Sequence, residues 1–162
     1  MGLIQFKPID VKEGTMNTRI LLVDDEIEFV DILAERLRNR NFHVTKAFDG
    51  NSALEKLKEF NFDVMILDVQ MPGTSGIDVL KTVKKQKPLT EVLMLTGHGT
   101  VETAIEGMRQ GAFDFLLKPC KIDILLEKIH NACQRKSEHE ARIQKAMVEK
   151  LSTSPMSVFE HF

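Results

Sequence analysis

The sequence predicts a doubly wound α/β fold, in which five parallel strands form a sheet that helices cover on both faces. Three continuous apolar runs of strand length lie at residues 20–23, 64–67 and 92–95. Strands buried on both faces have this character, because helices cover both sides of a parallel sheet. Between the runs, apolar residues recur at helical spacing. Such alternation is typical of right-handed βαβ units.

Two weaker strand candidates, residues 42–48 and 113–117, complete the set of five. The first alternates only in part between apolar and polar residues, and a weaker pattern suits the edge of a sheet. We expect the strand order 2-1-3-4-5, which places the second and fifth strands at the edges.

Five helices are expected between and after these strands. Three of them place four apolar residues on one face, namely Val30, Leu33, Ala34 and Leu37 in the first, Val101, Ala104, Ile105 and Met108 in the fourth, and Ile122, Leu125, Leu126 and Ile129 in the fifth. Shorter apolar faces mark the second and third, at Leu54 and Leu57 and at Val79, Leu80 and Val83. Gly111 is well placed to end the fourth helix.

The two ends of the chain lack this alternation. We expect a flexible leader at residues 1–17, a folded domain at 18–135, and a polar helical extension with a tail at 136–162. Within the extension, Ile143, Met147 and Leu151 recur at a spacing of four before Pro155 stops any helix. A solvated helix that frays and a self-associating or signalling helix are both compatible with this pattern.

Composition limits the class of protein. The 162 residues carry 22 basic and 24 acidic side chains, a formal net charge of −2, so no general positive charge favours nucleic-acid binding. The two cysteines, Cys120 and Cys133, are too few for a disulfide framework. The sequence shows no secretory signal and no apolar run that could span a membrane. We expect a reduced, cytoplasmic protein.

Polar side chains follow the expected strands at the point where each ends. Asp24 and Asp25 follow the first strand, Asp68 the third, Thr96 the fourth and Lys118 the fifth. In an open α/β sheet, binding sites form outside the carboxyl ends of the strands, where the winding reverses. The order 2-1-3-4-5 would therefore bring all five side chains to one pocket.

Three close carboxylates repel one another and require a cation. Few protein oxygens together with several waters favour Mg²⁺, for which Mn²⁺ could substitute. A carboxylate beside such an ion and opposite a lysine is suited to receive a phosphoryl group, which would leave an acyl phosphate.

Four sequence blocks resemble the signatures of response-regulator receiver domains, which have a flavodoxin-like fold. These blocks are LLVDDE at 21–26, DVQMPG at 68–73, LTG at 95–97 and FLLKP at 115–119, and the similarity runs from about residue 17 to about residue 135. The stretches TGHG at 96–99 and GAFDF at 111–115 are most similar to the nitrogen-regulator (NtrC) group. Receivers of that group usually precede an ATPase domain and a DNA-binding domain. Neither fits in the remaining residues, so direct nucleic-acid binding is not evident.

The resemblance implies roles for the residues at the strand ends. Asp68 would be the phosphorylated aspartate. Asp25 would ligate Mg²⁺ directly and Asp24 through water, with Asp68 and the backbone carbonyl of Gln70 as further ligands.

The resemblance also implies a switch. Thr96 would bond one phosphoryl oxygen and Lys118 another, while Phe115 would turn inward on activation. Similar receivers hold the peptide bond between Lys118 and Pro119 in cis.

Simpler interpretations of these residues stay open. Asp24 and Asp25 could cap the first helix, Asp68 and Thr96 could be turn residues, and Lys118 could be a surface lysine. Phe115 could be an ordinary core residue. His98 could control access of water to the acyl phosphate or could be an exposed loop residue.

Three functional hypotheses follow. The first is a receiver that accepts phosphate from a sensor histidine kinase or a histidine phosphotransfer protein, then switches a partner or homodimer surface made by the fourth helix, fifth strand and fifth helix. Such a domain is not an enzyme beyond its own phosphorylation and dephosphorylation. The alternatives are a Mg²⁺-dependent phosphatase with an aspartate nucleophile and a docking module that works without phosphate.

Overall fold

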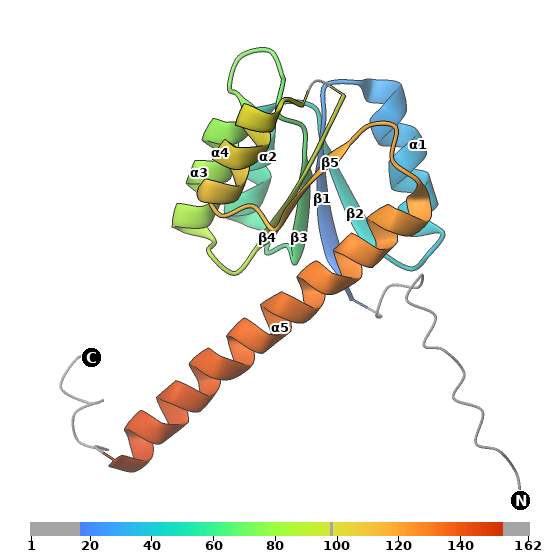
Figure 1. Cartoon of the computed structure of the whole chain (residues 1–162). Coiled ribbons are helices and arrows are strands. Elements are labelled where there is room, and N and C mark those ends of the chain that lie inside the picture. Colours follow the sequence, from blue (N-terminus) through green and yellow to red (C-terminus); the bar gives the residue numbers. More distant parts are fainter. Residues whose placement is uncertain (1–16, 98, 154–162) are drawn as a thin grey trace, which may run out of the picture.

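A computed structural model describes residues 17–97 and 99–153. Five strands and five helices alternate along the chain (Figure 1). The strands are β1 (Arg19–Val23), β2 (His43–Ala47), β3 (Val64–Leu67), β4 (Glu91–Thr96) and β5 (Asp114–Leu117). The helices are α1 (Ile27–Arg38), α2 (Gly50–Glu59), α3 (Gly76–Gln86), α4 (Val101–Arg109) and α5 (Ile122–Thr153).

The five strands form one parallel sheet in the order β2-β1-β3-β4-β5, which confirms the predicted fold class and topology. The strand β3 has the predicted bounds. The edge strands β2 and β5 are shorter than predicted, because Phe42, Phe48 and Phe113 lie outside the ladders. We call the end of the sheet where the strands finish the carboxyl edge, and the opposite end the amino edge.

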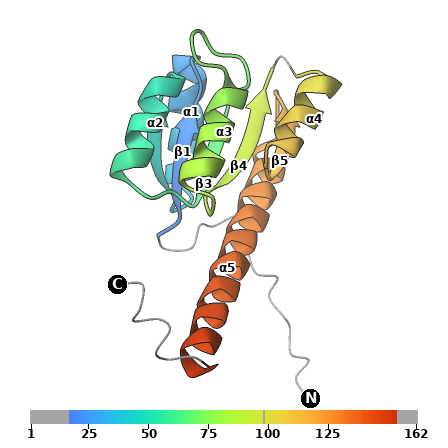
Figure 2. The same ribbon diagram turned by 90° about the vertical axis from the view of Figure 1, so that its left-hand side faces the viewer.

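Helices cover both faces of the sheet, and each face has its own core. Apolar side chains of α1 and α5 pack on one face, among them Val30, Leu37, Leu126 and Ile129. Those of α2 and α3 pack on the other, among them Leu57, Leu80 and Val83. Figure 2 shows α2, α3 and α4 together on this second face. The predicted helical faces of α1 and α5 are therefore the buried ones.

The helix α4 ends as predicted. Its last residue is Arg109, and Gly111 has φ +97°, a left-handed conformation that glycine adopts without steric cost. At the other end, the Thr100 hydroxyl accepts a hydrogen bond from the Thr103 backbone N–H, so this short helix has a defined start.

The helix α5 is much longer than the others. It runs without interruption for 32 residues, because no glycine or proline occurs between residues 122 and 153. Its first half packs on the sheet, whereas residues 137–153 are exposed and project beyond the amino edge (Figure 1). Ile143, Met147 and Leu151 are among the exposed residues, so both interpretations of the extension stay open.

Some predictions concern residues outside the part of the chain that the structure describes. These are most of the expected leader, His98, and the tail after residue 153. Among residues 17–97 and 99–153, none of the helices is both long and apolar enough to cross a membrane.

Candidate phosphoryl-acceptor site

Three aspartates meet at the carboxyl edge of the sheet. Asp24 and Asp25 follow β1 and Asp68 follows β3, and these two strands are neighbours with Val23 opposite Leu67. The backbone reinforces this placement, since the Asp68 N–H donates to the Val23 carbonyl at 3.0 Å. Each aspartate offers one carboxylate oxygen, and these oxygens lie within 4.8 Å of one another. The sheet topology thus brings the two acidic segments together.

Two of the three carboxylates are buried. Asp24 is 2% and Asp68 4% exposed, whereas Asp25 is exposed. Burial raises the pKa of Asp24 above its ordinary value, and the negative charge of Asp68 raises it further. Hydrogen bonds from Lys118 and from the Glu26 backbone N–H offset part of this increase. The pocket therefore holds more negative charge than its own groups stabilise.

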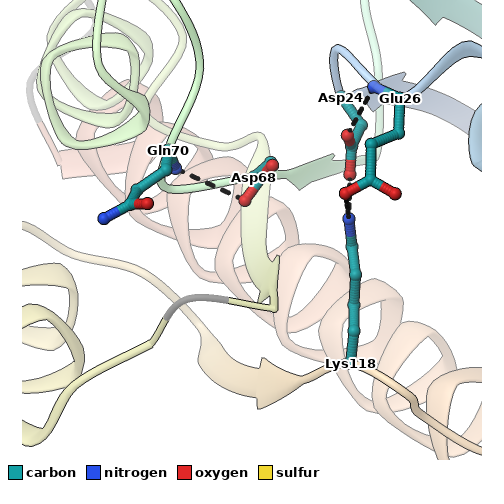
Figure 3. Close-up of polar contacts among 5 residues, drawn as sticks. All are labelled: Asp24, Glu26, Asp68, Gln70 and Lys118. Atoms are coloured by element: carbon teal, nitrogen blue, oxygen red, sulfur yellow. Dashed lines mark hydrogen bonds and ion pairs between the residues drawn. The ribbon is translucent and has the colours of Figure 1, made fainter.

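Lys118 supplies the cation of this pocket (Figure 3). Its backbone N–H donates to the Thr96 carbonyl at 2.8 Å, which ties the end of β5 to the end of β4. Its Nζ donates to Asp24 Oδ2 at 2.5 Å. Burial by itself would lower the pKa of Lys118, but the hydrogen bond and charge of Asp24 outweigh it, and the pKa is raised. The ammonium therefore stays charged opposite the acidic cluster.

The peptide bond between Lys118 and Pro119 is cis, as the family resemblance implied.

The loop after Asp68 approaches the strand end closely. The Gln70 backbone N–H donates to Asp68 Oδ1 at 3.3 Å, and the Gly76 N–H donates to the Val69 carbonyl at 2.9 Å. A Cβ atom at Gly76 would lie only 2.1 Å from the Asp68 carbonyl oxygen, which no side chain can occupy. Gly76 therefore permits the loop to close beside Asp68. The ligand role of the Gln70 carbonyl stays a prediction.

Thr96 and Phe115 come from the neighbouring strands β4 and β5. Thr96 is fully buried at the end of β4. Phe115, in β5, is half-buried and packs against the core of the α2–α3 face. This packing is what either an ordinary core aromatic or a switch aromatic would show, so the role of Phe115 also stays a prediction.

Two further residues contact Lys118, and the sequence interpretation did not single them out. Glu26 Oε1 lies 3.4 Å from Lys118 Nζ, and the ammonium lies 4.1 Å from the centroid of the Phe29 ring. A third acidic residue directly after Asp24 and Asp25 is a signal that could have identified Glu26. No such signal exists for Phe29, because an aromatic residue in the first turn of a helix is common in cores.

The donor set fits a divalent cation that prefers oxygen. Three carboxylate oxygens lie within reach of one ion, two from buried groups, and no histidine or cysteine among residues 17–97 and 99–153 belongs to this group. This is the ligand chemistry of Mg²⁺ or Mn²⁺ rather than of zinc.

Comparison with known proteins gives a consistent result. Residues 20–130 match the family model described as "Response regulator receiver domain". The chain is 36% identical over 127 residues to the transcriptional regulatory protein ZraR of Salmonella typhimurium, covering 78% of this chain and 29% of ZraR. It is 36% identical over 151 residues to the transcriptional regulatory protein FixJ of Bradyrhizobium diazoefficiens, covering 90% of this chain and 74% of FixJ.

A solved structure supports the same assignment. The receiver-domain protein of Clostridium thermocellum superposes with a TM-score of 0.71 at 36% identity, covering 74% of this chain and 97% of that one. The chain spans less than a third of the length of the ZraR proteins that it matches. Nothing in these comparisons supports the phosphatase or the phosphate-independent docking module.

Proposed function

The chain belongs to the response-regulator receiver family of two-component signalling, and we propose that it accepts a phosphoryl group on the Asp68 carboxylate. The observation that carries this proposal is the meeting of Asp24, Asp25 and Asp68 within 4.8 Å at one strand edge, with Lys118 bonded to the cluster. The pocket contains excess negative charge and one fixed cation, as a Mg²⁺-dependent phosphoryl acceptor requires.

The proposed transfer uses Asp68 as the nucleophile. One Oδ atom attacks the phosphorus of a phosphohistidine on a sensor kinase or a phosphotransfer protein. The new O–P bond forms as the N–P bond breaks, and the imidazole nitrogen keeps the electron pair. Burial of Asp68 at 4% exposure restricts water around the acyl phosphate that results.

The metal would be held by Asp25, Asp68 and the Gln70 carbonyl, with Asp24 acting through water. Bound there, Mg²⁺ supplies positive charge next to the phosphoryl oxygens. Lys118 supplies the second cation, and Thr96 a hydroxyl for another phosphoryl oxygen. Phe115 fills the space that Thr96 leaves.

The modification adds about −1.5 to −2 charge to a pocket that already contains three carboxylates. Movement of Thr96 and Phe115 would carry this change to the face formed by α4, β5 and α5. That face presents exposed apolar side chains, namely Val101, Ile105, Met108, Leu117 and Ile124. We propose it as the surface that a partner, or a second copy of the chain, recognises. Residues 18–135 would be the receiver and 136–162 an extension that lengthens α5.

Asp68→Asn tests the acceptor directly. Incubation with acetyl phosphate and Mg²⁺ should increase the intact mass of the wild-type chain by one phosphoryl group and leave Asp68→Asn unchanged. Asp78→Asn is the matched control, because Asp78 is an exposed aspartate in the first turn of α3 and should leave labelling unchanged. Labelling of Asp68→Asn, or labelling of the wild-type chain in excess EDTA, would refute the proposal.

Dimerisation through the α4–β5–α5 face is tested by sedimentation with and without beryllofluoride, a mimic of the phosphoryl group. A shift from monomer to dimer on activation is the expected result. A monomer in both states contradicts the dimer and leaves the face to a different partner.

A further inference from the structure

The Lys118 ammonium lies in a cage with one aromatic wall. Asp24 Oδ2 lies 2.5 Å and Glu26 Oε1 3.4 Å from Nζ, and the Phe29 ring centroid lies 4.1 Å away. The Lys118 side chain is only 12% exposed. A cation at this distance from a ring face is attracted by the ring quadrupole, more strongly where water is excluded.

The three residues that contact the ammonium come from one short segment. Asp24 directly follows β1, Glu26 is the N-cap of α1, and Phe29 lies in the first turn of that helix. Phe29 also packs against the core of the α1–α5 face, which fixes the ring. Asp68, although it is a buried member of the acidic cluster, is not among the hydrogen-bond or ion-pair partners of Lys118 in the described part of the chain.

We propose that Phe29 is a positioning residue that holds the Lys118 ammonium at Asp24, away from the acceptor Asp68. The inference rests on the proposed function, in which Lys118 must turn to a phosphoryl group on Asp68. The ring contributes attraction only while the ammonium is at Asp24. Unlike Asp24 or Glu26, it brings no negative charge that would bind Mg²⁺. Phe29 therefore favours the resting state without competing for the metal.

The experiment compares the affinity for beryllofluoride at saturating Mg²⁺. Phe29→Leu keeps an apolar side chain but removes the ring face, so the ammonium is released more readily. A cation–π contact contributes about 0.5–2 kcal/mol, which corresponds to an affinity for beryllofluoride higher by about 2- to 30-fold. Phe29→Tyr keeps the ring and should stay within about twofold of the wild-type chain.

An ordinary core role for Phe29 gives a different result. Loss of packing alone would lower the unfolding temperature of Phe29→Leu and leave the affinity for beryllofluoride unchanged. That outcome overturns the inference, as does a lower affinity, which would mean that the ring supports the activated state. Failure of the wild-type chain to bind beryllofluoride, or to be labelled on Asp68, would instead refute the proposed function.

A second variant reports on the ammonium itself. The chain contains no tryptophan or tyrosine, so Phe29→Trp introduces the single strong fluorophore, next to Nζ. Its emission should change when Mg²⁺ and beryllofluoride are added together. Ile32→Trp is the control, since Ile32 lies one turn later in α1 and is 57% exposed. An unchanged Phe29→Trp emission, or an equal change at Ile32→Trp, contradicts movement of Lys118 away from the ring.

Discussion

The two edges of the sheet balance their acidic side chains in different ways. At the carboxyl edge, Asp24, Asp25 and Asp68 lie together, and the ammonium of Lys118 is paired with Asp24 alone among the three. At the amino edge, three acidic residues are each paired with a cation from α5, and one of these cations, Lys136, also contacts Glu140. These pairs are Glu91 with Arg135, Asp63 with Lys136 at 3.1 Å, and Asp114 with Lys128 at 2.7 Å.

This difference in pairing distinguishes a binding site from a contact that only supports the structure. A matched pair such as Glu91 and Arg135 satisfies its buried carboxylate, and Arg135 also lies over the Phe113 ring. Paired in this way, the amino edge fastens α5 to the sheet. The carboxyl edge stays short of positive charge, which a metal ion can provide. Carboxylates therefore repel one another at the carboxyl edge, whereas ion pairs neutralise them at the amino edge.

Breaking the buried ion pair at the amino edge should have the largest effect on stability. Arg135→Met leaves the Glu91 carboxylate, with a side chain only 2% exposed, without its partner. We expect the free energy of unfolding to fall by about 1–3 kcal/mol, the cost of an unsatisfied buried charge. Urea denaturation followed by circular dichroism measures it. Lys128→Met is the control and should cost at most about 1 kcal/mol, because that pair is partly exposed. Equal losses would contradict the comparison.

Removing a charge from the crowded edge should have the opposite sign. Asp68→Asn eliminates one carboxylate next to Asp24 without breaking the ion pair of Lys118. In EDTA we expect the free energy of unfolding to rise by about 1 kcal/mol, since like charges in a buried cluster repel. The same urea titration tests this. A loss of stability would show that the carboxyl edge is balanced after all.

Mg²⁺ should neutralise the unpaired negative charge at the carboxyl edge and so stabilise the folded chain. At a concentration about five times its Kd, a ligand that binds only the folded state adds about 1 kcal/mol. We expect this gain in thermal denaturation of the wild-type chain and a smaller one in Asp25→Asn, which lacks an expected ligand. Ca²⁺, which prefers more protein oxygens, serves as the comparison ion. Equal gains in both proteins would exclude Asp25 as a ligand.

The smallest expected effect concerns the Cys133 thiol, which lies in α5 at the amino edge. Burial raises the pKa of this thiol to about 11, and Asp63 contributes to the increase. Because the folded pKa exceeds the unfolded value of 9.0, the neutral thiol contributes stability that is complete below about pH 9 and is lost as the pH rises through about 11. Alkylation of Cys133 by iodoacetamide at pH 8 should thus be at least tenfold slower in the folded chain than in urea.

Activation should leave this protection unchanged, since the ion pairs hold α5 at the amino edge. Mass spectrometry with and without Mg²⁺ and beryllofluoride gives the comparison. Faster alkylation on activation would mean that α5 lifts from the sheet.

The sequence predicts best those features that depend on neighbouring residues, such as the strands. The central strands, such as Val64–Leu67, were predicted because continuous apolar runs reflect burial on both faces. The edge strands were predicted one residue too long at Phe42, Phe48 and Phe113, which lie outside the ladders. Phe42 and Phe113 pack in the core of the α1–α5 face, whereas Phe48 is exposed. The topology then brings Asp24, Asp25 and Asp68 to one pocket.

The contacts around Lys118 could not be predicted in the same way. Its ammonium meets Glu26 and Phe29, which are separated from it by about ninety residues of sequence and are positioned by the first turn of α1. Neither residue type carries a pattern that distinguishes this role. The ion pairs of α5 escaped prediction for the same reason, since a lysine or arginine on a polar helix usually faces water.

The length of α5 also gives the molecule a lever. Beyond Arg135 the helix continues for residues 136–153, and at 1.5 Å per residue this arm measures roughly 27 Å. A tilt of about 5° around the anchored turn would displace the far tip by roughly 2 Å, a shift comparable to those that switch helix interfaces. A tilt of α5 too small to alter the sheet would therefore still move the far end of the helix by an amount that a binding partner can detect.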